Sequence, residues 1–294
     1  MTYDAANRLL TYNGEAVRYD ADGNMVYGPV NGEMGTLTYD CRNRLVSAGG
    51  VTYGYDPENV RISAETDSYR EVYVTESVSG SLSRVLVMTR YEKTDGADGN
   101  NAISGAGVET IYVYGNGLIS EETGDREYWH HYNNLGSTVL LTNELGQPVA
   151  EYTYGAYGEL LSGDATLTRF LYNGRCGVST DENGLYYMRQ RYYNVDIRRF
   201  INQDIITGDL TNSQSLNRYC YVQGNPVKYT DPFGLSPEDG GNKGGNFWHS
   251  LLGFVGIIPG PIGAVANAVD AAIEYDKKPR MAAKMLLLSD QPLS

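Results

Sequence analysis

The chain has 294 residues, and its 36 acidic and 23 basic residues give a formal net charge of −13. No basic face can be assembled from this composition, so we expect that the β-rich part of the chain binds no nucleic acid. Cys41, Cys176 and Cys220 stand far apart and match no zinc or disulfide spacing, and the three histidines offer no metal cluster. We therefore expect neither a metal site nor a cofactor.

The composition favours strands and tight turns. There are 26 Tyr and 35 Gly, but only 5 Phe and 10 Pro. Tyr suits half-buried strands, where its ring packs and its hydroxyl reaches a polar neighbour. Gly supplies the positive φ angles of tight turns. The sequence thus predicts many short strands joined by hairpins, which is a mainly β fold.

An internal repeat organises residues 1–92. YDAANRLL (3–10) returns as YDCRNRLV (39–46), with RYDADGNMVY (18–27) between them and YGYDPENVRIS (53–63) after them. Each unit alternates apolar and polar residues and then reaches Asp-Gly, Asn-Gly or Asp-Pro, which is typical of a β-hairpin. Because one hairpin cannot bury its own apolar face, we expect these units to pair side by side in an antiparallel sheet.

The pattern continues less regularly over residues 110–235. The stretches TIYVYGNGLIS, TVLLTNELGQPVAEYTYGAYGEL and RFLYNGRCGVSTDENGLYYMRQRYY have the same alternation and the same turn residues. Residues 93–109, KTDGADGNNAISGAGVE, lie between the two regions and are polar and rich in Gly. We predict that they form an exposed loop.

These residues carry a resemblance to a known family. The Tyr-Asp units resemble the YD repeats of the RHS/YD-repeat family, and NNLGSTVLLTNELGQPVAEYTYGAYGEL (133–160) resembles the start of its RHS repeat-associated core domain. RQRYYNVDIRRFINQD (189–204) and NRYCYVQGNPVKYTDPFGL (217–235) resemble the end of that domain. The resemblance implies antiparallel β-hairpins that spiral into a shell around a C-terminal effector, with the core domain as a plug. The family includes polymorphic toxins, the C subunits of insecticidal toxin complexes and, more distantly, teneurins.

The resemblance also implies a self-cleaving site. In many bacterial members the core domain resembles an aspartyl protease that cuts its own chain after the Leu of a DPxGL motif. Here that bond joins Leu235 to Ser236. The two catalytic carboxylates of the family map onto Asp204 and Asp231. One would take a proton from water while the other protonates the departing amine.

A guanidinium beside the two carboxylates would hold them and the strained carbonyl in place. Arg199 is the residue that we expect in this role, with Arg218 as a second support. Asp204 and Asp231 are 27 residues apart, so they can meet only through folding.

The motif departs from the family pattern. The usual RYYDPxxGRF reads RYYNVDIRRF, so Asn194, Val195 and Arg198 replace Asp, Pro and Gly, and Ile205 follows the first aspartate where Pro is usual. The alternative interpretation is that both aspartates merely cap turns, as Asp before Pro or Gly commonly does.

The composition changes after the junction. SPEDGGNKGGN begins a flexible linker over residues 236–247, and residues 248–294 are rich in Ala, Ile, Leu and Val at helical spacing. This segment resembles the pre-toxin linkers of polymorphic toxins. Pro259 and Pro261 interrupt its longest apolar run, so we expect a broken helical hairpin that contacts a membrane rather than a simple span. No catalytic constellation follows, and we expect the effector itself to be absent.

The sequence therefore predicts a C-terminal fragment of an RHS polymorphic toxin, with an encapsulating shell and a self-cleaving core. Its expected partners are its own C-terminal effector segment, secretion machinery and an upstream portion of the parent that completes the shell. Met1 leads straight into TYDAANRLL without a signal peptide, so we expect secretion or surface display through the parent protein. The alternative is a structural or adhesive YD-repeat surface protein, teneurin-like, without proteolysis.

Overall fold

The computed structural model describes residues 1–76, 82–95, 101–103, 105–208, 211–235 and 237–239. They belong to one compact unit that takes in Met1–Glu76 and Leu82–Asn242. The predicted helical segment 248–294, and most of the predicted linker 236–247, lie outside the described residues.

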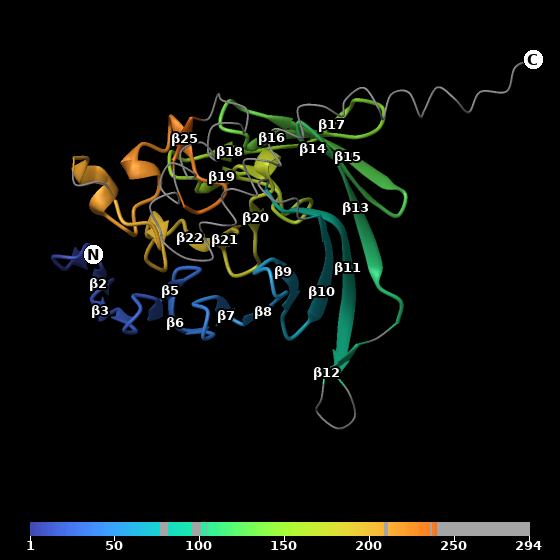
Figure 1. Ribbon diagram of the computed structural model, residues 1–294. Coiled ribbons are helices and arrows are strands. Elements are labelled where there is room, and N and C mark those ends of the chain that lie inside the picture. The colour runs from blue at the N-terminus through green and yellow to red at the C-terminus, as the bar shows by residue number, and fades with distance from the viewer. Residues whose placement is uncertain (77–81, 96–100, 104, 209–210, 236, 240–294) are drawn as a thin grey trace, which may run out of the picture. The chain divides into compact units, whose positions relative to one another are not determined.

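A 14-stranded antiparallel sheet is the largest sheet of the described residues. Its strands follow one another in chain order (Figure 1), except that among these residues β12 pairs only with β11 and β11 pairs directly with β13. Residues 1–92 and 110–151 both contribute to it, so the prediction of a mainly β fold of antiparallel hairpins is confirmed. The strands are β4 (Arg18–Tyr19), β5 (Met25–Val30), β6 (Glu33–Tyr39), β7 (Leu45–Ala48), β8 (Val51–Tyr55), β9 (Arg61–Glu65), β10 (Tyr69–Glu76), β11 (Arg84–Asp95), β12 (Asn101–Ile103), β13 (Val108–Gly115), β14 (Gly117–Thr123), β15 (Arg126–Tyr132), β16 (Thr138–Thr142) and β17 (Pro148–Glu151).

Smaller sheets and short 3-10 helices make up the other elements of the described residues. Before the long sheet stand β1 (Thr2–Tyr3), β2 (Leu9–Tyr12) and β3 (Glu15–Ala16). After it come β18 (Thr153–Tyr154), β19 (Leu160–Ser162), η1 (Gly174–Cys176), β20 (Ser179–Thr180), β21 (Leu185–Met188), β22 (Arg191–Asn194), β23 (Arg199–Phe200), η2 (Ser213–Leu216), η3 (Val222–Gly224), β24 (Tyr229–Thr230) and β25 (Glu238–Asp239).

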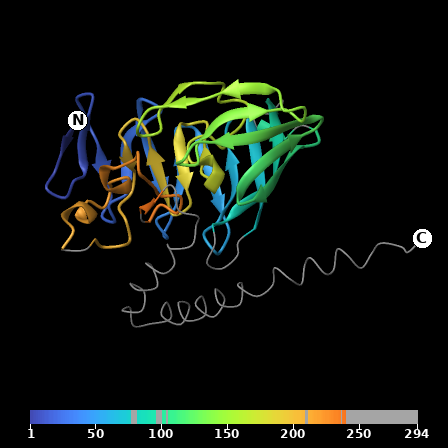
Figure 2. The same cartoon turned by 90° about the horizontal axis from the view of Figure 1, so that it is seen from above.

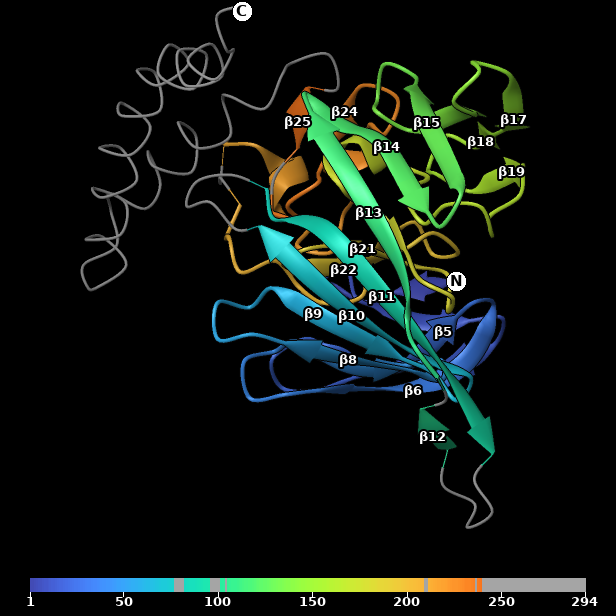
Figure 3. The ribbon, with the colours of Figure 1, turned by 90° about the vertical axis from the view of Figure 1, so that its right-hand side faces the viewer.

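The prediction of a loop over residues 93–109 is wrong for the part that is described. β11 runs on to Asp95, and its last three residues pair with β12 in the register Lys93↔Ile103 to Asp95↔Asn101. Figure 3 shows β12 beside the far end of β11. Backbone hydrogen bonds between two strands need no apolar side chain, and polar composition therefore did not exclude a hairpin here.

Several hairpins close on one kind of five-residue turn. Asp4, Asp40, Asn133 and Asn143 each accept hydrogen bonds through Oδ1 from the backbone N–H groups two and four residues later. The fourth residue of each turn has a positive φ, for example 60° at Asn43. Asn and Gly tolerate that conformation best, which explains the recurring Asp-x-x-Asn and Asp-x-x-Gly spacing of the sequence.

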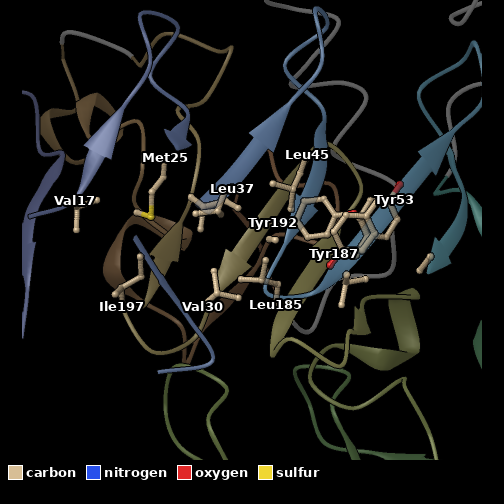
Figure 4. Packing of buried hydrophobic residues seen from close by; sticks show 14 of the residues in the cluster. Val17, Met25, Val30, Leu37, Leu45, Tyr53, Leu185, Tyr187, Tyr192 and Ile197 are labelled. Carbon is tan, nitrogen blue, oxygen red and sulfur yellow. The ribbon is translucent and has the colours of Figure 1, made fainter. Parts of the chain in front are cut away.

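Residues 164–235, the inner segment, pack against one face of the long sheet. The Asn183 side chain donates to the carbonyl of Ala48 (2.8 Å), and the Asn194 side chain donates to the carbonyl of Pro29 (2.8 Å). Figures 1 and 2 show the yellow and orange inner segment beside the blue and green strands. Figure 4 shows the core between them, where Leu37 and Leu45 of the sheet meet Leu185 of the inner segment.

A buried ion pair joins the sheet to the inner segment. Arg61 of β9 and Asp181 make two hydrogen bonds, of 2.5 and 3.0 Å, and the whole Arg61 residue is only 3% exposed. The rings of Tyr53 and Tyr187 flank the guanidinium, with centroids 5.3 and 4.2 Å from its carbon. Both charges are thus paired and enclosed by aromatic faces, which is what makes their burial tolerable.

We predict that Asp181→Asn lowers the free energy of unfolding by about 3 kcal/mol, because it leaves the Arg61 charge buried without its counter-ion. Urea denaturation of the purified chain measures this. Arg70→Gln is the matched control, since Arg70 and Glu65 form an exposed pair at 3.7 Å, and we expect it to cost less than about 1 kcal/mol. Equal losses in the two variants would contradict a structural role for the buried pair.

Candidate active site at the junction loop

The two aspartates that the sequence singled out converge on one guanidinium. Arg191 Nη2 lies 2.7 Å from Asp204 Oδ2 and 3.4 Å from Asp231 Oδ2. The two carboxylate oxygens are therefore no more than 6.1 Å apart, which is 2.7 Å plus 3.4 Å. Arg191, Asp204 and Asp231 are 4%, 9% and 2% exposed, so the three charges meet away from bulk water.

Three consecutive residues hold the junction loop, which we define as Asp231–Leu235. Arg189 Nη1 donates to the carbonyl of Pro232 (2.7 Å), the Gln190 N–H donates to the carbonyl of Phe233 (3.2 Å), and Arg191 Nε donates to the carbonyl of Gly234. The turn between β21 and β22 thus fixes three successive carbonyls of the loop. These hydrogen bonds hold the chain that leads to Leu235 against the β21–β22 turn.

Gly234 is required by this close approach. Its φ is 71°, and a Cβ at this position would lie 2.6 Å from the carbonyl oxygen of Met188. Both the backbone conformation and the lack of space exclude larger residues. The Gly of DPFGL is therefore explained by the packing of the loop against the β21–β22 turn.

Asp204 lies four residues after the end of β23 and is held beside Arg191 through its backbone. Its backbone N–H donates to the carbonyl of Arg218 (2.9 Å), and the Arg218 guanidinium donates to the carbonyl of Asp204. The carbonyl of Arg218 also accepts from Arg191 Nη1 (3.1 Å). Arg218 thus supports the Asp204 backbone, while Arg191 contacts the carboxylate.

Arg199, which the sequence favoured as the guanidinium between the two aspartates, lies against the N-terminal hairpin instead. Its Nη1 donates to the carbonyl of Asn7 (2.7 Å), and its guanidinium stacks on the ring of Tyr3 at 4.4 Å. On strand β23, Arg199 pairs with Asn194 and faces the N-terminal hairpin. The guanidinium between the two carboxylates is therefore that of Arg191, not that of Arg199.

Sequence reasoning missed Arg191 although a signal was present. The β22 sequence RYYN is buried at all four positions. A charged residue that opens so apolar and aromatic a strand needs a carboxylate partner, because an unpaired buried charge is costly. On this ground Arg191 is selected before Arg199, which directly follows a second arginine, Arg198.

Both aspartates also cap turns. Asp231 Oδ1 accepts from the N–H of Leu235 (2.9 Å), and Asp204 Oδ1 accepts from the N–H of Ile206 (2.8 Å). The Gly234 N–H donates to the carbonyl of Asp231, so the junction loop repeats the five-residue turn of the YD units. Each carboxylate thus uses one oxygen for its turn and directs the other toward Arg191.

Burial dominates the electrostatics of Asp204. It raises the pKa of this carboxyl above its usual value, and the positive charge of Arg191 offsets only part of the increase. Desolvation likewise lowers the pKa of the Arg191 guanidinium, against the pull of Asp204. A carboxyl with a raised pKa is the group suited to donate a proton near neutral pH.

A cavity of about 180 Å³ opens beside these residues. Asp204, Arg191 and Leu235 line it from the inner segment, and Tyr39 and Arg44 line it from the sheet. It has room for several water molecules next to the Asp204 carboxyl.

Other chemistry finds little support in the described part of the chain. No group of three or more His, Cys, Asp or Glu side chains there could hold a metal ion. No helix there has the length and hydropathy needed to cross a membrane. Burial raises the pKa of the Cys176 thiol, which disfavours a thiolate nucleophile. Ser236 and the apolar segment from residue 248 lie outside the described residues.

Comparisons with known proteins find relatives that include a nuclease and a toxin subunit, although no family model matches the chain. The tRNA3(Ser)-specific nuclease WapA of Bacillus spizizenii is 32% identical over 133 residues, which are 43% of this chain and 6% of that protein. Toxin subunit YenC1 of Yersinia entomophaga is 26% identical over 196 residues, which are 62% of this chain and 20% of that protein.

A crystal structure of TcdB2-TccC3 has the same fold over 74% of this chain and 11% of that chain, with a TM-score of 0.52 and 20% identity. The chain is thus similar to toxin proteins and spans only a small part of the relatives that it matches. The likeness to the solved structure concerns the fold alone.

The segment after the junction loop pairs with β24, the strand before the loop, and carries a third carboxyl. Glu238 of β25 lies opposite Thr230 of β24, and burial together with the negative charge of Asp231 raises the pKa of Glu238 to about 7. The folded chain then binds a proton that the unfolded chain releases above about pH 4.5. The stability from this proton is complete below pH 4.5 and is lost as the pH rises through about 7.

We therefore predict that Glu238→Gln makes stability less dependent on pH between about 4.5 and 7, because Gln cannot ionise. Urea denaturation midpoints at several pH values in this range measure the slope. Glu33→Gln, on the exposed side of β6, is the control and should keep the wild-type slope. An unchanged slope in Glu238→Gln would contradict the buried carboxyl.

Proposed function

We propose that the chain is a shell segment of an RHS-type toxin that cuts itself after Leu235 to free a C-terminal effector. The observation that carries this proposal is the convergence of Asp204 and Asp231, 27 residues apart in sequence, on Arg191 beside the fixed junction loop. Similarity to a nuclease and to a toxin subunit supports the toxin class. The upstream shell, the effector and the secretion route belong to the parent protein under this proposal.

The chemistry is hydrolysis of the peptide bond between Leu235 and Ser236. The Asp231 carboxylate takes a proton from a water molecule, whose oxygen attacks the carbonyl carbon of Leu235. The Asp204 carboxyl, with its raised pKa, gives its proton to the departing amine. Asp231 gains one proton and Asp204 loses one, so the two carboxyl groups have exchanged their protonation states.

Arg191 positions both carboxylates and the carbonyl before the leucine. It holds Gly234 through Nε and the two aspartates through Nη2. Its positive charge also limits the repulsion between two carboxylates that approach within a few ångströms.

The second candidate function is structural. The turn caps made by Asp204 and Asp231 need no catalysis, and the same cap occurs at Asp56, where Oδ1 accepts from the N–H of Val60 (2.8 Å). Under this alternative the three charges fasten the inner segment in a YD-repeat surface protein that stays intact.

We predict that the purified chain slowly yields an N-terminal piece that ends at Leu235. Asp204→Asn and Asp231→Asn should each abolish it, because an amide neither accepts nor returns the required proton. Arg191→Gln should slow it by about a hundredfold through misplacement of the carboxylates. Intact-mass spectrometry over several days follows the products.

Two controls accompany this experiment, and one competing reaction must be told apart from it. Arg199→Ala should cleave at the wild-type rate, since its guanidinium contacts Asn7 and Tyr3. The Asp56–Val60 turn has the same Asp-Pro start but should remain uncut. Chemical scission of the acid-labile Asp231–Pro232 bond would leave Pro232 as the new N-terminus. Cleavage after Leu235 that persists in Asp204→Asn would refute the dyad and favour the structural function.

We also predict that cleavage is faster at pH 5 than at pH 8. The general acid must be protonated, and the rate should fall up to tenfold per pH unit once the pH exceeds the raised pKa of Asp204. Initial rates of formation of the piece that ends at Leu235, measured at one ionic strength, test this. A rate that increases steadily toward pH 8 would contradict Asp204 as the acid.

A further inference from the structure

Five arginines converge on the cavity beside the candidate active site. The chain has a net charge of −13, yet its guanidinium groups outnumber its carboxyls around this space. The acidic lining residues are Asp22 and Asp204. The arginines that line the cavity are Arg42, Arg44, Arg189, Arg191 and Arg218.

Two of these arginines are neutralised by carboxylates. Arg44 binds Asp40 at 2.7 Å, and Arg191 binds the Asp204 and Asp231 pair. These two charges therefore have fixed counter-ions in the folded chain.

The other three arginines bind neutral acceptors. Arg42 donates to the carbonyl of Pro57 (2.9 Å), Arg218 donates to the carbonyl of Asp204, and Arg189 donates to three backbone carbonyls. Within the described residues, no carboxylate lies at ion-pair distance from these three guanidinium groups. The lining thus carries positive charge that its own ion pairs leave uncompensated.

Two buried polar atoms of lining residues also have no hydrogen-bond partner in the described chain. They are Arg189 Nε and the Tyr39 hydroxyl oxygen. Arg189 as a whole is 9% exposed, and an unsatisfied donor on so buried a cation is costly. A buried cation of this kind favours a negative charge nearby, which an anion in the cavity would supply.

The turn that begins at Asp40 does not need the side chain of Arg42. Ala6 occupies the same place in the first repeat, and its N–H donates to Asp4 at 2.9 Å just as the N–H of Arg42 donates to Asp40 at 2.9 Å. The turn forms equally well with a methyl side chain. The Arg42 guanidinium, which lines the cavity and donates to the carbonyl of Pro57, can therefore be removed without loss of the turn.

We propose that this cavity is a binding site for a small oxyanion, a carboxylate or a phosphate. A volume of about 180 Å³ is below the roughly 300–1,000 Å³ of pockets for larger organic ligands, and planar guanidinium groups match two-oxygen anions. One source of the ligand is the α-carboxylate that hydrolysis would create on Leu235, which lines the same cavity. The other source is free phosphate. The first source rests on the proposed cleavage, and the site itself does not.

The test uses the full chain, verified as intact by mass, in calorimetric titrations at constant ionic strength. The probes are N-acetyl-leucine, inorganic phosphate and the uncharged N-acetyl-leucinamide. We expect binding of at least one anion and none of the amide. Arg42→Ala should weaken binding by about tenfold, because it removes a charged hydrogen bond without disturbing the turn. Arg126→Ala, an exposed arginine on β15, is the matched control.

The outcomes distinguish the Leu235 carboxylate from free phosphate as the ligand, and they distinguish the oxyanion site from the proposed self-cleavage. Tighter binding of N-acetyl-leucine supports the leucine carboxylate as ligand, and binding of phosphate alone supports the site with a free ion as ligand. The site is overturned if neither anion binds at millimolar concentration, or if Arg42→Ala binds as the wild type does. A chain that never cleaves but binds an anion through Arg42 refutes the proteolysis and leaves the oxyanion site standing.

Discussion

The hydrogen bond from a turn carboxylate or amide to the backbone is the constraint on which the rest of the structure depends. A two-stranded hairpin offers little burial of its own, so the turn has to help set the register of each unit. Asp4 and Asp40 do so by accepting two N–H groups with one oxygen. The recurrence of this turn sets the spacing of the strands along the chain. Neighbouring strands then pair as one antiparallel sheet.

The junction loop reuses that turn and changes its surroundings. Asp56 and Asp231 both precede Pro and both bond the N–H four residues later. At Asp231 the buried guanidinium of Arg191 also contacts the second carboxylate oxygen, and the same guanidinium nitrogen contacts Asp204. The turn motif of the repeat thus lies beside a guanidinium and a second carboxylate at the junction loop alone among the turns described above.

Buried charges fasten the inner segment to the sheet at several points. Besides the pair of Arg61 with Asp181, Glu71 of β10 binds Arg169 at 2.6 Å. Burial by itself would raise the pKa of Glu71, but Arg169 and its other partners lower it to about 2. Each such pair is costly to break from one side, and this disfavours alternative placements of the segment on the largely aromatic face.

The sequence by itself determined the class of fold and the turns, because period-two alternation and the Asp-x-x-Asn spacing act through neighbouring residues. It also selected Asp204 and Asp231, through a motif resemblance. It did not determine which arginine meets them: Arg199 is nearer to Asp204 in sequence, yet the hairpin of β22 and β23 brings Arg191 to the carboxylates and turns Arg199 toward Asn7. Only the tertiary structure decided this, because contacts such as those of Arg191 with Asp204 and Asp231 depend on how the strands pack.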